Sequence, residues 1–304
     1  MAEVSNIYLD QPDPLSVLLT RLDLKAEVYV NGDFCGTWAV DTAGSKRIPF
    51  HLIGSGNAWL HFEDQQAQGL SSRDLVVFPH DSHHIISNTE QKPNAEIVNS
   101  SFSGEGEVTN MVCGFFEFRN SAIFPLLDAL PNVVVLKSAT DEHEERIDYL
   151  IRLMLNELKL SRPGFYTAID QMAFLIFVEV LRKQMEFGHI EQGLLTALFD
   201  NKLGRALNAI HQKPDNQWTL ELLAEEALMS RSGFADTFSK TVGVTPMKYL
   251  TKWRMSEARR LLRTTSMSVA QIADKSGYET EAAFRKAYKN IMGEPPGEAR
   301  AKQI

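Results

Sequence analysis

Five of the eight histidines lie between positions 51 and 84, where they could bind a divalent metal ion or a small ligand. Neutral imidazole nitrogens suit divalent metals such as zinc, and the metal-ligand candidates are His51, His80 and His84. His51 and His84 are also candidates for contact with an effector. The alternative is that these side chains are only hydrogen-bonded within a β-rich domain, and we therefore predict no bound metal and no cofactor.

Cys35 and Cys113 are the only thiols in the chain. Free cysteines commonly behave as small buried apolar residues, which is the default interpretation here. The alternative is a redox switch, in which an ionised and accessible thiolate is oxidised and then resolved. Two cysteines are too few for a secreted disulfide scaffold, so the sequence predicts a cytoplasmic protein.

Two helices predicted at 231–242 and 281–292 present side chains that could contact DNA. Apolar residues recur at helical spacing on the side expected to face the core, namely Phe234, Phe238 and Val242, then Phe284, Tyr288 and Ile291. On the opposite faces, basic residues can reach guanine edges or phosphates, and small ones permit close approach. The alternative is a solvated surface. The DNA-contact candidates are Arg231, Ser232, Ala235, Asp236, Ser239, Glu281, Ala282, Arg285, Lys286 and Lys289.

These two helices belong to an internal repeat. Phe234, Phe238, Gly243 and Pro246 recur 50 positions later as Phe284, Tyr288, Gly293 and Pro296, whereas Leu223-Ala224 recurs 49 positions later as Ile272-Ala273. The second copy therefore has one extra residue in its turn. Each copy is a short helix, a tight turn and a helix of about three turns, which is a helix-turn-helix. The second helix of this motif normally enters the DNA major groove.

The N-terminal part reads as a β-domain. Segments 25–30, 58–62, 75–78 and 111–118 are rich in β-branched and aromatic residues, and clusters of Gly, Asn, Asp and Ser separate them. Short strands with regular turn signals favour a sandwich or barrel.

Helical patterns follow the β-domain. Segments 141–160 and 165–187 have apolar residues at helical spacing, and Arg162-Pro163-Gly164 separates them. Such helices pack against the β-domain or form a dimer contact. From Lys202 onward the chain reads as short helices. Their expected N-caps are Thr219, Ser230, Thr245 before Pro246, Ser268 in a capping box with Gln271, and Thr280.

Length and charge divide the chain in the same way. The 304 residues suggest two domains. Residues 1–200 carry 14 Lys and Arg against 28 Asp and Glu, whereas residues 201–304 carry 17 against 11. A basic module joined to an acidic one suggests an anionic partner for the basic part. The most apolar run, 173–181, is too short to span a membrane, and the N-terminus does not read as a secretion signal.

Residues 205–302 closely resemble the AraC-type transcriptional regulators, which carry two helix-turn-helix units joined by a long helix. The residues that carry the resemblance are Leu223-Ala-Glu-Glu-Ala-Leu-Met-Ser-Arg-Ser-Gly-Phe-Ala-Asp-Thr-Phe238, Gly243-Val-Thr-Pro246, Trp253-Arg-Met255, Ile272-Ala273, Gly277-Tyr278 and Gly293-Glu-Pro-Pro296. The resemblance implies that the helices at 231–242 and 281–292 enter successive major grooves about 34 Å apart. The family often has a basic residue at Asp236, where an acid would accept from a cytosine amino group or lower nonspecific affinity.

The first 130 residues resemble the cupin-type sensor domain found in one branch of these regulators. The matching stretches are Asp13-Pro-Leu-Ser16, Phe34-Cys-Gly-Thr-Trp38, Pro49-Phe-His-Leu52, Gly56-Asn-Ala-Trp-Leu60, Asp74-Leu-Val-Val-Phe-Pro79 and Cys113-Gly114. A cupin is a small β-barrel that often holds a metal or small ligand. The usual metal pattern has two histidines one residue apart, and here Leu52 and Ile53 follow His51. Some cupin-type relatives sense oxidants through cysteines in similar contexts.

The sequence therefore predicts an α+β multidomain protein with a cupin-like barrel at 1–135, a helical linker or dimerisation segment at 136–200, and an all-α double helix-turn-helix domain at 201–304. The expected function is sequence-specific transcription regulation, and activation fits the family better than repression. The expected partners are double-stranded operator DNA, RNA polymerase, a small-molecule or oxidant effector and a second copy of the chain. The rival interpretation is a metal-dependent cupin enzyme fused to a DNA-binding domain.

Overall fold

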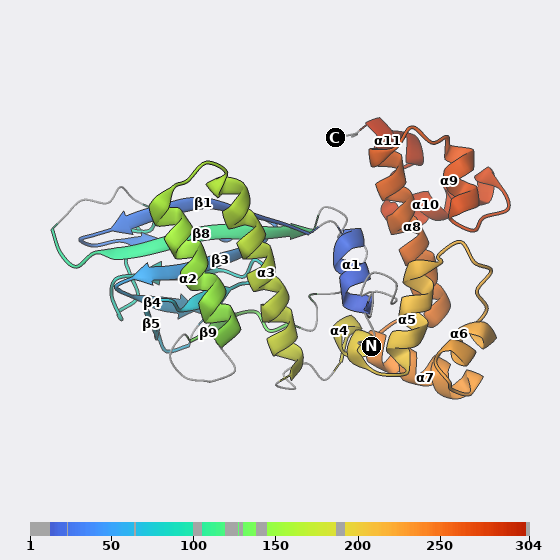
Figure 1. Cartoon of the computed structure of the whole chain (residues 1–304), viewed down its shortest axis with the longest axis horizontal. Coiled ribbons are helices and arrows are strands. Elements are labelled where there is room, and N and C mark those ends of the chain that lie inside the picture. Colours follow the sequence, from blue (N-terminus) through green and yellow to red (C-terminus); the bar gives the residue numbers. More distant parts are fainter. Residues whose placement is uncertain are drawn as a thin grey trace, which may run out of the picture. The chain divides into compact units, whose positions relative to one another are not determined.

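The computed structural model describes residues 13–22, 24–63, 65–99, 105–118, 127, 130–137, 145–186 and 192–301. The chain forms two compact units, which we describe separately. The barrel unit contains strands β1 to β9 with helices α2 and α3, and the helical unit contains α1 and α4 to α11 (Figure 1). This arrangement confirms the predicted fold class.

Two antiparallel sheets build the barrel unit. One has the strand order β1-β8-β3-β6-β9 and the other β2-β7-β4-β5. Large apolar side chains from both sheets form one core cluster, which includes Trp38, Phe62 and Met111. The strands are β1 (Leu24–Phe34), β2 (Ala39–Val40), β3 (Ile48–Ser55), β4 (Asn57–Phe62), β5 (Gln68–Ser71), β6 (Leu75–Val77), β7 (His84–Ser87), β8 (Thr109–Phe118) and β9 (Val134–Leu136).

The burial of each strand follows from what covers it. Residues of β4 alternate between buried and more exposed positions, as expected for a strand with one wet face. Six successive residues of β3 are buried, because this strand is central in its sheet. In the neighbouring strand β8, a Cβ at Gly114 would lie 2.5 Å from the backbone oxygen of Glu27 in β1, so glycine lets these two strands approach as they do.

Helices α2 (Glu145–Leu160) and α3 (Phe165–Glu186) cover one face of the barrel unit (Figure 1). Phe177 of α3 packs on Phe116 of β8, with ring centroids 4.5 Å apart. In α2, the residues Ile147, Ile151 and Met154 are buried, as the helical spacing predicted. The helices therefore do pack against the β-domain.

The helical unit includes an N-terminal helix that the sequence reading missed. Helix α1 (Pro14–Leu22) begins after Asp13, whose carboxylate accepts a hydrogen bond from the backbone N–H of Ser16 at 2.9 Å. Leu15, Leu18 and Leu19 of this helix are buried. The helix packs on α4 (Leu194–Phe199) and α5 (Leu203–Gln212). Helix α4 lies in the segment 136–200 predicted as a linker, and it groups with the helical unit.

The two helix-turn-helix units lie along the chain as predicted. The first is α6 (Leu220–Glu226) and α7 (Arg231–Val242), and the second is α9 (Val269–Lys275) and α10 (Glu281–Met292). Helix α8 (Pro246–Thr264) joins them, and α11 (Pro296–Ala301) follows. The side chains of Thr219, Ser230, Thr245 and Thr280 cap their helices, and the capping box of Ser268 with Gln271 is present. Among the described helices, none is long and apolar enough to span a membrane.

Candidate nucleic-acid interface and effector site

Helix α7 separates core and surface residues as the sequence predicted. Phe234 and Phe238 are fully buried, and Phe238 meets Tyr249 of α8 edge-on, with ring centroids 5.7 Å apart. On the opposite side, Arg231, Ser232 and Asp236 are exposed, and Ala235 and Ser239 are half-buried. The helix ends at Gly243 in the left-handed conformation, with φ 80°. These five residues therefore share one accessible face.

Helix α10 repeats this arrangement. Phe284 and Tyr288 are fully buried, whereas Ile291, predicted to face inward, is only partly buried. The predicted DNA-facing side chains lie on the accessible side. Ala282, Arg285, Lys286 and Lys289 are exposed, and Glu281 is partly exposed.

Ion pairs make the two faces electrostatically different. On α7, Lys240 pairs with Asp236 at 2.8 Å, and Arg231 pairs with Glu221 of α6 at 2.7 Å. On α10, Arg285 pairs with Glu281 at 2.6 Å. Within the described part of the chain, Lys286 and Lys289 make no ion pair. The second unit therefore offers more unneutralised positive charge.

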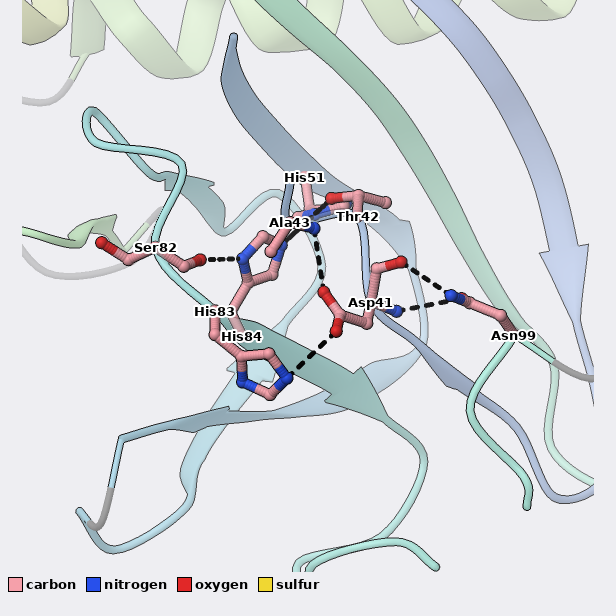
Figure 2. Close-up of polar contacts among 8 residues, drawn as sticks. All are labelled: Asp41, Thr42, Ala43, His51, Ser82, His83, His84 and Asn99. Carbon is pink, nitrogen blue, oxygen red and sulfur yellow. Dashed lines mark hydrogen bonds and ion pairs between the residues drawn. The ribbon is translucent and has the colours of Figure 1, made fainter. Parts of the chain in front are cut away.

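The candidate effector site is a cluster of polar side chains inside the barrel unit, around two histidines (Figure 2). His51 of β3 and His84 of β7 are both fully buried, and their Nε2 atoms are 3.0 Å apart. The hydroxyl of Thr42 lies 3.1 Å from each Nε2 atom. On its other side, His51 Nδ1 lies 3.2 Å from Cys113 Sγ. The His84 ring stacks on Phe78 with a centroid distance of 3.5 Å.

One backbone carbonyl fixes the direction of this hydrogen-bond chain. His84 Nδ1 lies 2.7 Å from the carbonyl oxygen of Ser82, which can only accept, so Nδ1 carries a proton. A neutral His84 then accepts at Nε2, and His51 donates from its own Nε2. His51 Nδ1 is left as an acceptor for the thiol proton of Cys113. Thiol, two imidazoles and carbonyl thus form one directed chain.

The environment keeps every member of this chain neutral. Burial first, and then the neighbouring His84, hold the pKa of His51 well below its ordinary value. Burial also lowers the pKa of His84, although the Ser82 carbonyl opposes this effect. Burial raises the pKa of the Cys113 thiol to about 12. Cys113 therefore stays a thiol near neutral pH, and it does not meet the requirement for an accessible, ionised redox cysteine.

The other predicted residues lie apart from this cluster. His80 is exposed, and its Nε2 lies 2.9 Å from the carbonyl oxygen of Leu130. Cys35 is half-buried, and both cysteines are free. Within the described residues, no group of three or more His, Cys, Asp or Glu side chains could hold a metal ion. Two imidazoles and a neutral hydroxyl remain, which is a weak ligand set.

Sequence reasoning missed Thr42 and Ser82, which hold the two rings. Next to Ser82, an open cavity of about 430 Å³ is lined by His61, Glu63, Ser82, His83, Ile85 and Lys92. His83 also pairs with Asp41 at 3.1 Å, and Asp41 in turn bonds Asn99 (Figure 2). The lining includes charged side chains of both signs, and it includes Ser82, whose carbonyl contacts His84.

Comparisons with known proteins agree with both parts of this description. A cupin family model matches residues 13–186, and a helix-turn-helix domain model matches residues 223–302. A putative AraC-like transcription regulator of Streptomyces lividans is 32% identical over 95% of this chain and 98% of its own length. The chain belongs to the AraC-type transcriptional regulators.

Two other relatives match over most of this regulator. An uncharacterized HTH-type transcriptional regulator of Haemophilus influenzae is 30% identical over 95% of the chain and 98% of its own length. The RCS-specific HTH-type transcriptional activator RclR of Escherichia coli is 28% identical over 83% of the chain and 84% of its own length. Relatives across nearly the full length are therefore regulators, and the alternative of a cupin enzyme is not supported.

The buried histidines predict that acid destabilises the barrel unit. Because their folded pKa values are lowered, the unfolded chain binds more protons below its ordinary histidine pKa of 6.5, and stability falls as pH falls from there. The loss is at most about 1.4 kcal/mol per pH unit for each histidine. Calorimetric unfolding at about pH 7.5 and about pH 5.5 measures it. His51→Gln should reduce the pH dependence, because it removes one of the two buried imidazoles. Equal slopes in the wild type and this variant would contradict this.

The unequal pairing predicts unequal effects of lysine removal on DNA binding. Lys289→Ala should weaken binding to all sequences and reduce the slope of log affinity against log salt by about 0.9, as expected for one lost phosphate contact. Lys240→Ala, which removes the same charge from the first unit, should change both less, because Asp236 already neutralises that lysine. Titrations with labelled DNA at several salt concentrations measure both quantities. A larger effect of Lys240→Ala would reverse the assignment.

Proposed function

We propose that this regulator binds a specific operator through α7 and α10, activates transcription, and responds to a small polar molecule at the barrel unit. The observation that carries the proposal is the pair of accessible helix faces, each opposite a buried aromatic pair. The equivalent positions lie 50 residues apart, so both faces can have the same role. On this proposal the named basic and small residues of α7 and α10 contact base edges and phosphates.

We place the effector at the cavity beside Ser82. Its lining includes Lys92 and Glu63, so a small molecule with both polar and charged groups would find partners of either sign. Ser82 holds the His84 ring through its carbonyl, so a ligand there would act on the buried hydrogen-bond chain. A ligand that prefers one arrangement of the barrel would shift the equilibrium between active and inactive regulator. An oxidant is a less suitable signal, because the Cys113 thiol is buried and un-ionised.

We further propose that the protein is a homodimer whose contact is formed by α2. Tyr149, Leu153, Asn156 and Leu160 follow each other at intervals of four, three and four residues, the spacing of a coiled-coil seam. Three of these four residues are large and apolar yet exposed, Tyr149 by 66%, Leu153 by 38% and Leu160 by 52%. The relative RclR is named an activator, and an activator bound beside a promoter would contact RNA polymerase.

The signal is tested with reporter expression and serine variants. Reporter expression in the presence of hypochlorous acid or hydrogen peroxide should be the same in the wild type, in Cys35→Ser, in Cys113→Ser and in the double variant. Polar metabolites should instead be screened for a rise in melting temperature, since a ligand at about 100 times its dissociation constant stabilises by about 2.7 kcal/mol. Lys92→Ala should reduce that rise. An oxidant response that disappears with either cysteine would contradict the small-molecule proposal.

The dimer is tested by sedimentation equilibrium. Leu153→Glu should dissociate it, because two like charges would face each other across the contact. Leu175→Glu is the matched control, since Leu175 of α3 is 48% exposed and lies outside the row. A wild type that remains monomeric at micromolar concentration, or equal effects of both variants, would contradict the proposed contact.

A further inference from the structure

Two helix-turn-helix units on one chain keep a fixed separation only if contacts hold both of them. Arg254 of α8 lies where it can contact both units. Helix α8 packs on the first unit near its start, where Tyr249 is buried against Phe238 of α7. Near its end it contacts the second unit, and Arg259 pairs with Glu294 at 3.6 Å. Arg254 lies between these two groups of contacts.

The guanidinium of Arg254 bonds the loop that leads into the first unit. Its Nε donates to the carbonyl of Pro214 at 2.8 Å, and its Nη2 donates to the carbonyl of Asn216 at 2.9 Å. This loop ends at Thr219, the N-cap of α6. Two hydrogen bonds from one planar group fix its direction better than a single bond from an ammonium could.

The same guanidinium lies against the turn of the second unit. A Cβ at Gly277 would be 2.7 Å from Arg254 Nη2 and 2.8 Å from its Cζ. The guanidinium can withdraw only by breaking its bonds to Pro214 and Asn216. Arg254 therefore touches the entry of the first unit and the turn of the second at once.

Comparison of the two copies of the repeat shows how Arg254 affects the turn of the second unit. Gly277 has a φ of 72°, and the residue 49 positions earlier, Leu228, has a φ of 52°. Both occupy the left-handed region at the same point of the turn. Leu228 is a leucine that is 69% exposed, whereas the second copy has glycine where Arg254 lies on the backbone. Left-handed backbone alone thus tolerates a side chain here, and in the second copy a side chain would displace the Arg254 guanidinium.

We propose that Arg254 is a positioning residue that fixes the two helix-turn-helix units relative to each other and thereby sets the operator spacing that the regulator accepts. The inference rests on the proposed reading of DNA by both α7 and α10. Two linked readers gain affinity from each other only when their separation matches that of the two half-sites. A residue that fixes the separation of the two units therefore makes affinity depend on the spacing of the half-sites.

The test compares operators that differ in spacing. An operator is first selected from random DNA with the wild-type chain, and versions are made with each half-site alone and with the half-sites moved apart by one base pair. For Arg254→Met, affinity for each half-site should stay within about twofold of wild type, while affinity for the full operator falls about tenfold or more. The difference between the native and the shifted spacing should shrink. Arg254→Lys should recover part of the spacing preference.

Arg205→Met is the matched control. Arg205 also donates from Nε to a backbone carbonyl, that of Glu226 at 2.8 Å, but this bond joins α5 to α6 and involves no residue of the second unit. This variant should keep the wild-type spacing preference. Parallel losses on half-sites and full operator, or an unchanged spacing preference in Arg254→Met, would overturn the inference. A wild type that selects no sequence would instead overturn the proposed function.

Discussion

Two short recognition helices can read one DNA site only if the protein holds them at a fixed separation. Each helix-turn-helix has a small core, made of Phe234 and Phe238 in one copy and Phe284 and Tyr288 in the other. Helix α8 packs on both α7 and α10 and carries the connection between them. This fixed separation is what lets the exposed faces of α7 and α10 act on one DNA site. The caps define where each helix begins, and the contacts of Arg254 lie between the two units.

Much of this half could be predicted from the sequence because its signals are local. Capping residues, helical spacing and the 50-residue repeat depend on neighbours within a few turns, and α7 and α10 begin and end where expected. Helix α1 was missed because its nine residues are helical in the context of α4 and α5, far along the chain. The contact of Arg254 with Gly277 was also beyond prediction, since it depends on three segments meeting.

Less of the candidate site in the barrel unit could be predicted from the sequence. Candidate histidines could be named from composition, but which of them meet depends on strand pairing. His51 faces Cys113 because β3 pairs with β8 in that register, and His84 reaches His51 from the other sheet. His80 was also a candidate, but its ring contacts the Leu130 carbonyl, a contact that composition and spacing do not indicate. The chemistry of the cluster follows from burial, which keeps the thiol and both imidazoles neutral.

The most direct test of the two-reader account is to map each recognition helix on the selected operator. An iron chelate attached at Ser232→Cys or at Ala282→Cys, in a chain whose own two cysteines are replaced by serine, cleaves the DNA nearest to that helix. The account predicts two cleavage centres in successive major grooves, about one helical turn of 10 base pairs apart. Cleavage from only one of the two positions, or from both in the same groove, would contradict it.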